Sequence, residues 1–244
     1  MMPSKSDIEK AKEYLRRRLS AEIKMEHYLD IQLMKAAKEV VSLAYERNIP
    51  PTLFSFNYDV VLSYEIDKII RKLTNDIEEY NIILATSTDK EDSQALLTYI
   101  NRDIDGITYN QRINNYTSRF KIELQHFVTA GLISGLTKQA ITNIIAKYYK
   151  QPYKNSIISN VEHKGVSSYN RLLLLTRYTI ADSWMYADMR YAIKNGAIGF
   201  YSFRGSSYPC QLCDDYAKVF HTFADPYPPY HNRCCCYAVP VYNK

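Results

Sequence analysis

Cysteine is absent from the first 209 residues of this 244-residue chain, and all five cysteines lie between Cys210 and Cys236. Glycine is also scarce, with seven residues, whereas tyrosine is abundant, with 23. This composition excludes a collagen-like chain and a low-complexity tail. With 46% hydrophobic and 23% charged residues, the chain is typical of a globular protein.

Long apolar runs are missing as well. The longest uncharged and mostly apolar stretch, residues 127–137, is too short to cross a bilayer. Residues 1–19 lack the apolar core of a secretory signal. We therefore expect a soluble protein of a reducing compartment, with no membrane partner.

The sequence also lacks recognisable catalytic motifs. The sequence shows no glycine-rich phosphate loop, no Ser-His-Asp order and no paired-acid motif. Residues 209–213 match the PCxxC half of a nucleobase deaminase, but that chemistry also needs a His-x-Glu whose glutamate moves the proton. No histidine of the chain is followed by x-Glu: the five are His27, His126, His163, His221 and His231. We expect no enzymatic activity and no small-molecule substrate.

What is present is mostly helical periodicity. Apolar residues recur at helical spacing in three stretches, which predicts helices over 6–44, from about 57 past 77, and over 109–133. In the first stretch these residues are Ile8, Ala11, Leu15, Leu19, Ile31, Met34 and Val41. Thr137 as a cap predicts a short helix over 137–149, and an apolar run that ends before Gly196 predicts a long helix over 167–195.

The last part of the chain has a different pattern. Residues 198–203, 217–223 and 234–242 are rich in aromatic and β-branched residues, which predicts short strands. A module of this size buries little apolar surface and commonly needs a disulfide or a metal. The predicted fold class is mainly α with a long-helix body and a small C-terminal β-rich (α+β) zinc-type module. The predicted domains are 1–135 (helical body), 136–195 (basic helical segment) and 196–244 (Cys/His module).

The cysteines and one histidine show the spacing of a metal site. Two pairs separated along the chain can complete a tetrahedron, as in closed structural zinc sites. On an extended strand Cys234 and Cys236 point one way and Cys235 the other, so Cys235 is the poorest candidate. We expect a structural zinc ion held by Cys210, Cys213, His231 and Cys234, with Cys236 as the replacement for His231 or Cys234.

Other interpretations of these cysteines stay open. The thiols can be reduced, buried and free of metal. Disulfides conflict with the odd number of cysteines and a reducing compartment. A thioredoxin-like redox pair opens a helix after a buried strand, whereas residues 211–216 are predicted to lead into a hairpin.

Basic residues concentrate in one segment. Residues 136–177 contain seven Lys/Arg against one acid, a net charge of +6, whereas residues 1–135 contain 18 against 20, a net of −2. Such a segment can contact phosphate, with Tyr148, Tyr149 and Tyr153 stacking on bases. The alternative is a solvated helix face. The candidate nucleic-acid residues are Lys147, Lys150, Lys154, Lys164 and Arg171.

From about residue 110 onward the chain resembles the phage Mu protein F-like minor head proteins, also called phage head morphogenesis proteins. Chains of that family end in CxxC, a K-V-F-like segment, prolines and an H-P-x-C-R-C close. The corresponding residues here are Cys210–Cys213, Lys218-Val219-Phe220, Pro228-Pro229 and His231–Cys236. Ala217 replaces a glycine of the pattern, Asn232 a proline and Cys235 an arginine.

The resemblance implies a virion component present in few copies inside the head. It implies a portal or inner-capsid partner, a role in head morphogenesis or genome delivery, and the host cytoplasm as the location during assembly. Packaged double-stranded DNA is the further partner that we expect for the basic segment. The alternative is a cytoplasmic zinc-module protein that binds nucleic acid and is not present in virions.

Overall fold

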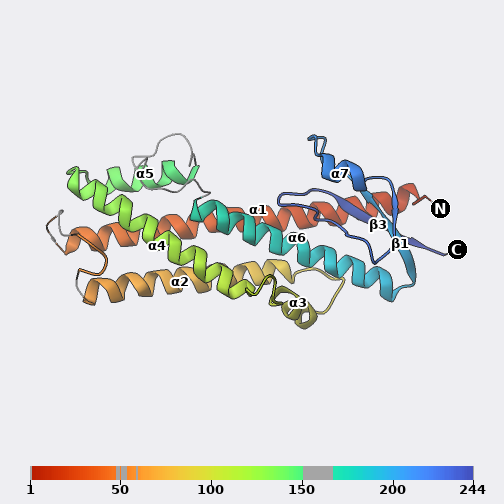
Figure 1. The fold of residues 1–244 in the computed structure, drawn as a ribbon, viewed down its shortest axis with the longest axis horizontal. Helices are drawn as coiled ribbons and strands as arrows, with labels where there is room; N and C mark the ends of the chain where they lie inside the picture. Colours follow the sequence, from red (N-terminus) through yellow and green to blue (C-terminus); the bar gives the residue numbers. More distant parts are fainter. Residues whose placement is uncertain (1, 48–49, 51–53, 59, 151–166, 244) are drawn as a thin grey trace. The chain divides into compact units, whose positions relative to one another are not determined.

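The structure is a computed structural model that describes residues 2–47, 50, 54–58, 60–150 and 167–243. Over these residues the chain is mostly helical, with one small antiparallel sheet near the C-terminus (Figure 1). This confirms the predicted mainly helical class with a small β-rich part. The elements are α1 (Lys5–Glu46), α2 (Val60–Ala85), α3 (Ser93–Ile100), α4 (Tyr109–Ile133), α5 (Lys138–Lys150), α6 (Ser168–Lys194), β1 (Ala197–Phe203), α7 (Gln211–Tyr216), β2 (Phe220–His221) and β3 (Tyr237–Tyr242).

The chain forms two compact units, each assembled from separate stretches. Unit 1 consists of residues 1–26, 80–104 and 174–244, and unit 2 of residues 27–79 and 105–173. The Cys/His residues belong to unit 1, together with the first part of α1. The basic segment is divided, with residues 136–173 in unit 2.

The sheet of unit 1 has the strand order β2-β1-β3, with all pairs antiparallel. In β3 the side chains alternate between two helices, as the pleat of a strand requires. Ala238 packs in a cluster with Met185 and Met189 of α6, whereas Tyr237 and Val239 pack against Leu15 of α1. The sheet is therefore held between the first half of α1 and the second half of α6.

Helix α6 is fixed in unit 1 by hydrogen bonds as well as by apolar contacts. Trp184 is buried, and its Nε1 donates to the carbonyl of Leu84 at 3.0 Å. The Tyr14 hydroxyl donates to the carbonyl of Trp184 at 2.8 Å. These bonds satisfy polar groups that burial would otherwise leave without partners.

Unit 2 is built from helices whose ends and contacts follow from their sequence. Thr108 and Gln111 form a capping box at the start of α4. Gly131 of α4 leaves the space that the Ile141 side chain of α5 occupies. The buried Glu123 accepts hydrogen bonds from the backbone N–H and the hydroxyl of Ser168, at 3.0 and 2.5 Å, where α6 begins.

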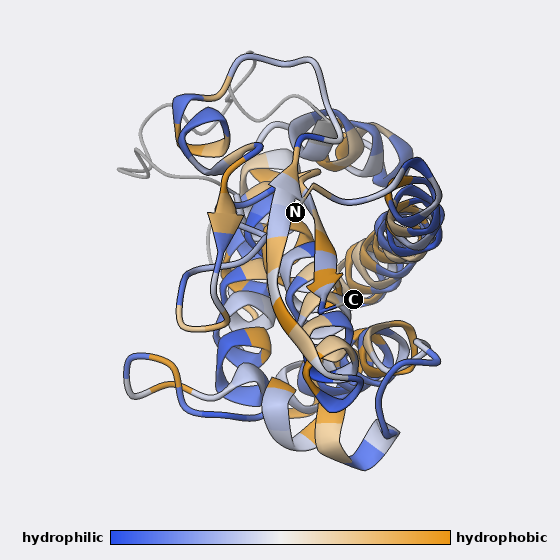
Figure 2. Ribbon diagram, turned by 90° about the vertical axis from the view of Figure 1, so that its right-hand side faces the viewer, coloured by the Kyte–Doolittle hydropathy of each residue, from blue (hydrophilic) through white to orange (hydrophobic). Residues whose placement is uncertain are grey.

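Hydrophilic and hydrophobic residues alternate along several of the helices, as the blue and orange bands of the ribbon show (Figure 2). The bounds predicted for α4 and α6 are within one or two residues of those observed. In the predicted stripe of α1, Ile31 is wrong, because it is 50% exposed, whereas Met34 is half-buried and Val41 is buried. No helix in the described part of the chain is both long enough and apolar enough to span a membrane.

Two of the three C-terminal strands are shorter than the sequence predicted, whereas β1 matches its predicted range to one residue. The strand expected over 217–223 is reduced to β2, and β3 begins at Tyr237 rather than at residue 234. Residues 211–216, expected to lead into a hairpin, form the short helix α7 instead. Cys210 and Cys213 therefore lie at the start of α7, and Cys234 to Cys236 precede β3, so none of the cysteines lies within a strand.

Candidate metal centre

The first cysteine pair is placed by α7. Cys210 occupies the N-cap position with an extended backbone, and Cys213 lies in the first turn of the helix. The Asp214 N–H donates to the carbonyl of Cys210 at 3.0 Å, which closes the turn. A helical turn brings both sulfurs to one side, and Cys213 is buried whereas Cys210 is half-buried.

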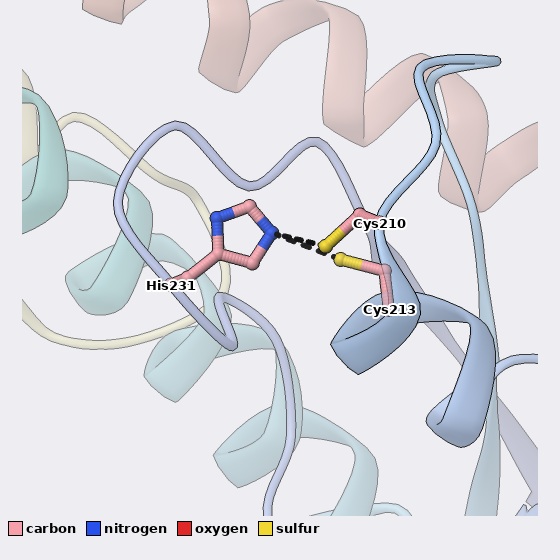
Figure 3. Close-up of side chains that lie close together, drawn as sticks. All are labelled: Cys210, Cys213 and His231. Atoms are coloured by element: carbon pink, nitrogen blue, oxygen red, sulfur yellow. Dashed lines mark hydrogen bonds between the residues drawn. The ribbon is translucent and has the colours of Figure 1, made fainter.

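The second group arrives after the loop that follows β2. His231 Nε2 lies 3.3 Å from the Sγ of Cys210 and 3.0 Å from the Sγ of Cys213 (Figure 3). On the other side of the ring, Nδ1 is 2.7 Å from the carbonyl oxygen of Asn232, to which Nδ1–H donates. That bond leaves Nε2 with a lone pair directed at the sulfurs, the arrangement of metal-ligating histidines.

Cys213 joins two groups of metal-ligating atoms. It lies with Cys210 and His231 in one triad and with Cys234 and Cys236 in another, and the ligand atoms of each triad are within 4.8 Å of one another. The Sγ atoms of Cys213 and Cys234 are 3.8 Å apart. A tetrahedral ion with metal–sulfur bonds of about 2.3 Å separates two ligand sulfurs by about 3.8 Å. These clusters could bind a metal ion, and the donor set fits one.

The fifth cysteine lies apart from these triads. The Sγ of Cys235 contacts the carbonyl of Arg233 at 3.7 Å, and the residue is half-buried. Burial raises the pKa of its thiol. The structure thus brings together the predicted ligands Cys210, Cys213, His231 and Cys234 with the alternate Cys236, and it leaves Cys235 outside.

The thiols differ in how readily they ionise. The hydrogen bond from the Cys236 thiol lowers the pKa of Cys234 to about 5, whereas burial raises the pKa of Cys213 to about 12. The pKa of Cys210 is lowered, chiefly by the hydrogen bond from the backbone N–H of Cys213. Metal binding requires deprotonated thiols, so loading this cluster would release protons, foremost from Cys213.

Aromatic residues fix the loop that carries His231. Tyr230 packs against the three buried cysteines of the cluster and stacks on Tyr216 of α7 with the ring centroids 4.4 Å apart. His221, predicted to be a surface or packing residue, is buried and stacks on Phe200 at 5.2 Å. Its Nε2 is 2.9 Å from the carbonyl of Tyr216, so this histidine helps to hold the last residue of α7 in place.

One argument made from the sequence is wrong. The CxxC does open a helix, because α7 begins directly after Cys210, so this feature does not distinguish the site from a thioredoxin-like pair. The distinction comes from His231 and Cys234, which add a third and a fourth donor beside Cys213. The acids that follow the CxxC, Asp214 and Asp215, are exposed as expected, and Arg204 donates to Asp214.

The predicted nucleic-acid residues are placed less completely. Lys147 is exposed on α5, and the half-buried Arg171 lies 5.9 Å from the ring of Tyr116. Lys154, Lys164 and the side chain of Lys150 lie outside the described residues. The stacking role expected for Tyr149 is wrong, because this ring is 5% exposed and packs against Phe120 and Tyr169.

Sequence reasoning missed a buried arginine beside the cluster. Arg18 of α1 has no exposed surface, and its Nη2 donates to the carbonyl of Cys234 at 3.0 Å. Its Nε lies 3.2 Å from Glu22, which is also buried. The available signal was position: Arg18 and Glu22 fall on the helix face of Leu15, three and seven residues along.

No protein-family model, no curated protein and no solved structure matches the chain.

Proposed function

We propose that this chain is a non-enzymatic structural component of a phage head. In this proposal the protein is present in few copies inside the head, bound to the portal or the inner capsid, and acts in head morphogenesis or genome delivery. A structural zinc ion in the Cys/His cluster stabilises its C-terminal part. During assembly the protein would be in the host cytoplasm.

The observation that carries the proposal is the convergence of Cys210, Cys213, His231 and Cys234, in the order and spacing of the phage Mu F-like close. Thiolate and imidazole donors are those that zinc prefers, and they are poor ligands for magnesium or calcium. With Cys236, the two triads offer five protein donors, and four are enough to close a tetrahedral ion without a substrate or water ligand. This favours a structural ion over a catalytic one.

Exposed apolar side chains support a docking role for the helices. Val60, Val61 and Tyr64 lie on the first turns of α2 in unit 2 and are 85%, 53% and 58% exposed. Adjoining apolar residues on a surface are typical of protein–protein contacts. The proposal assigns this surface to contact with the portal or the inner capsid.

A second candidate function follows from the basic segment. The exposed Lys147 of α5 supports a contact with DNA phosphates. If the protein is absent from phage particles, this contact becomes its main activity, and the protein is a cytoplasmic zinc-module nucleic-acid binder.

The decisive experiment is quantitative mass spectrometry of purified particles from the phage or induced prophage that encodes the chain. We expect a few copies per particle relative to the major capsid protein. As a control, a cytoplasmic phage protein expressed at the same time should be absent from the particles. Absence of this chain from particles, together with expression in the infected cell, would contradict the head role.

Zinc is tested separately on the purified full chain by elemental analysis. We expect about one zinc ion per chain, as a closed site of four ligands holds. Protein that folds fully and holds no zinc after incubation with Zn²⁺ would contradict the structural-zinc part of the proposal. The particle count would then stand alone as the test of the head role.

A further inference from the structure

We propose that Arg18 is a positioning residue for the metal centre, through which metal binding and the docking of residues 8–22 of α1 onto the sheet become one cooperative step. The inference rests on the proposed metal site. It concerns a residue 216 positions before Cys234 along the chain, and it makes the first half of α1 part of the Cys/His module.

Arg18 is held from both sides. Its Nη2 donates to the backbone carbonyl of Cys234, a candidate ligand, and its Nε lies 3.2 Å from the Oε1 of Glu22. Glu22 is itself bound through Oε2 by Arg177 of α6 at 3.1 Å, and Arg177 also pairs with Glu26 at 3.2 Å. The guanidinium therefore connects the ligand segment to α1 and, through Glu22, to α6.

Because Arg18 is buried, the loss of its hydrogen bond to the carbonyl of Cys234 is costly. Arg18 is 0% exposed and Glu22 is 3% exposed, and a buried guanidinium needs acceptors in place because water cannot replace them. Within the described residues, neither its Nη1 nor its Nε makes a hydrogen bond, and the contact of Nε with Glu22 is an ion pair, which increases the dependence on the Cys234 carbonyl. If the Cys234–Cys236 segment moves, Arg18 loses this acceptor, and the burial of α1 is no longer favourable.

Apolar packing connects the same two segments. Leu15 lies in a cluster with Tyr237 and Val239, directly after the cysteines. At Gly205 a Cβ would clash with the carbonyl of Cys235 and would lie 2.7 Å from the Cδ2 of Leu15. The carbonyl of Cys234 thus accepts a hydrogen bond from Arg18 of α1, and the carbonyl of Cys235 lies beside Gly205, which is close to Leu15 of α1. A shift of the cysteine segment would therefore disturb the helix.

Linkage makes the effect reciprocal. If metal binding fixes the Cys234 carbonyl and that carbonyl stabilises Arg18, then a docked α1 must raise metal affinity by the same factor. Residues that orient metal ligands typically change affinity by about 10- to 100-fold when replaced. We expect a loss in this range when Arg18 can no longer donate to Cys234.

The first test uses the wild-type full chain and needs no variant. Hydrogen exchange is measured on zinc-loaded protein and again after removal of zinc with a chelator. We expect backbone amides of residues 8–22 to lose protection together with those of residues 231–238, while residues 113–128 of α4 in unit 2 keep theirs. Unchanged protection of residues 8–22 after zinc removal would overturn the inference.

The second test measures zinc affinity by competition with a chromophoric chelator. Arg18→Met should bind Zn²⁺ about 10- to 100-fold more weakly, and Arg18→Lys, which keeps a donor but not the planar fork, should recover part of the loss. The matched control is Arg16→Met on the same helix, whose exposed side chain pairs with the exposed Glu13. Equal affinities for Arg18→Met and wild type would overturn the inference and leave the zinc site standing.

The head role is independent of both outcomes. A chain that is missing from particles but shows the exchange pattern described would lose its proposed function and keep this coupling. A chain that binds no Zn²⁺ in the competition assay would lose the coupling, whatever the particle count shows.

Discussion

The Sγ of Cys213 lies 3.8 Å from the Sγ of Cys234, although 21 positions separate the two residues along the chain. Cys213 is also the member that the two ligand triads share, so its removal breaks both of them at once. Removal of Cys210 or of Cys236 breaks only one. Cys213 is accordingly the residue on which the whole cluster depends.

Cys213→Ser should abolish zinc binding and unfold the C-terminal part around β1, α7 and β3, because metal binding at such a site is folding free energy. Most of the far-ultraviolet helical signal should remain, since α2, α4 and α5 contain none of the ligands. Elemental analysis and circular dichroism test this. The control is Cys235→Ser, which lies outside both triads; loss of zinc in both variants alike would contradict the prediction.

The fourth ligand can be identified by comparing His231→Ala with Cys236→Ala. With the ligands Cys210, Cys213, His231 and Cys234, the histidine variant should weaken zinc binding the more strongly. The intensity of the sulfur-to-metal charge-transfer band of the cobalt(II) form counts the thiolates, and three are expected. If the band falls in Cys236→Ala and stays unchanged in Cys234→Ala, then Cys236 is the ligand in place of Cys234.

Gly205→Ala should destabilise unit 1, because the new Cβ meets the backbone carbonyl of Cys235 and the side chain of Leu15. Overpacking of this kind costs about 1–3 kcal/mol. Urea unfolding of the zinc-loaded chain measures the free energy of unfolding. The neighbouring Ser206→Ala is the control, since Ser206 is exposed, and an equal stability of the two variants would refute the close approach.

Asp188 should make stability fall as pH rises from about 4. Burial raises the pKa of this carboxyl above its ordinary value of 3.8, and the Lys90 ammonium only partly opposes the shift. A carboxyl whose folded pKa is raised contributes stability below its unfolded pKa, and this contribution is lost as pH rises through the folded pKa. From pH about 4 upward, the difference between the urea midpoints of wild type and Asp188→Asn should change with pH. A difference that stays constant would exclude this role of Asp188.

DNA binding by the basic segment should depend steeply on salt. Each phosphate contact that is lost reduces the slope of log affinity against log salt by about 0.9. Lys147→Ala should show this reduction on double-stranded DNA, with affinity measured by fluorescence anisotropy over a salt series. The control is Lys12→Ala, an exposed lysine of α1 that pairs with Glu9. An affinity that does not change with salt would exclude the contact.

The features predicted well are those set by local pattern. Helical periodicity located α4, because a stripe of apolar residues every three or four positions has few other ways to be buried. Helix α6 was located by its apolar run and by Gly196, which stops it. Alternation along an extended segment set Cys235 apart from Cys234 and Cys236, although the segment is not a strand of the sheet. These predictions needed no knowledge of what packs nearby.

The features predicted wrongly depend on distant partners. Ile31 is half-exposed, and only the burial of Leu33, two positions further along on another face of α1, shows which face the rest of unit 2 covers. Tyr149 looked available for stacking until α4 and α6 were seen to enclose it. Arg18, one of three consecutive arginines, was not predicted to be buried, and its partners are Glu22 and the distant carbonyl of Cys234.

The bond between Arg18 and Cys234 spans 216 positions of sequence, and unit 1 closes only when both ends of that interval are present. During synthesis the first half of α1 therefore leaves the ribosome long before the strand and cysteines that cover its buried face. Its apolar and charged groups must remain exposed, or be shielded by another protein, until β3 has been made. Contacts of such high sequence separation fold slowly, so this helix is the segment of the nascent chain most open to a chaperone.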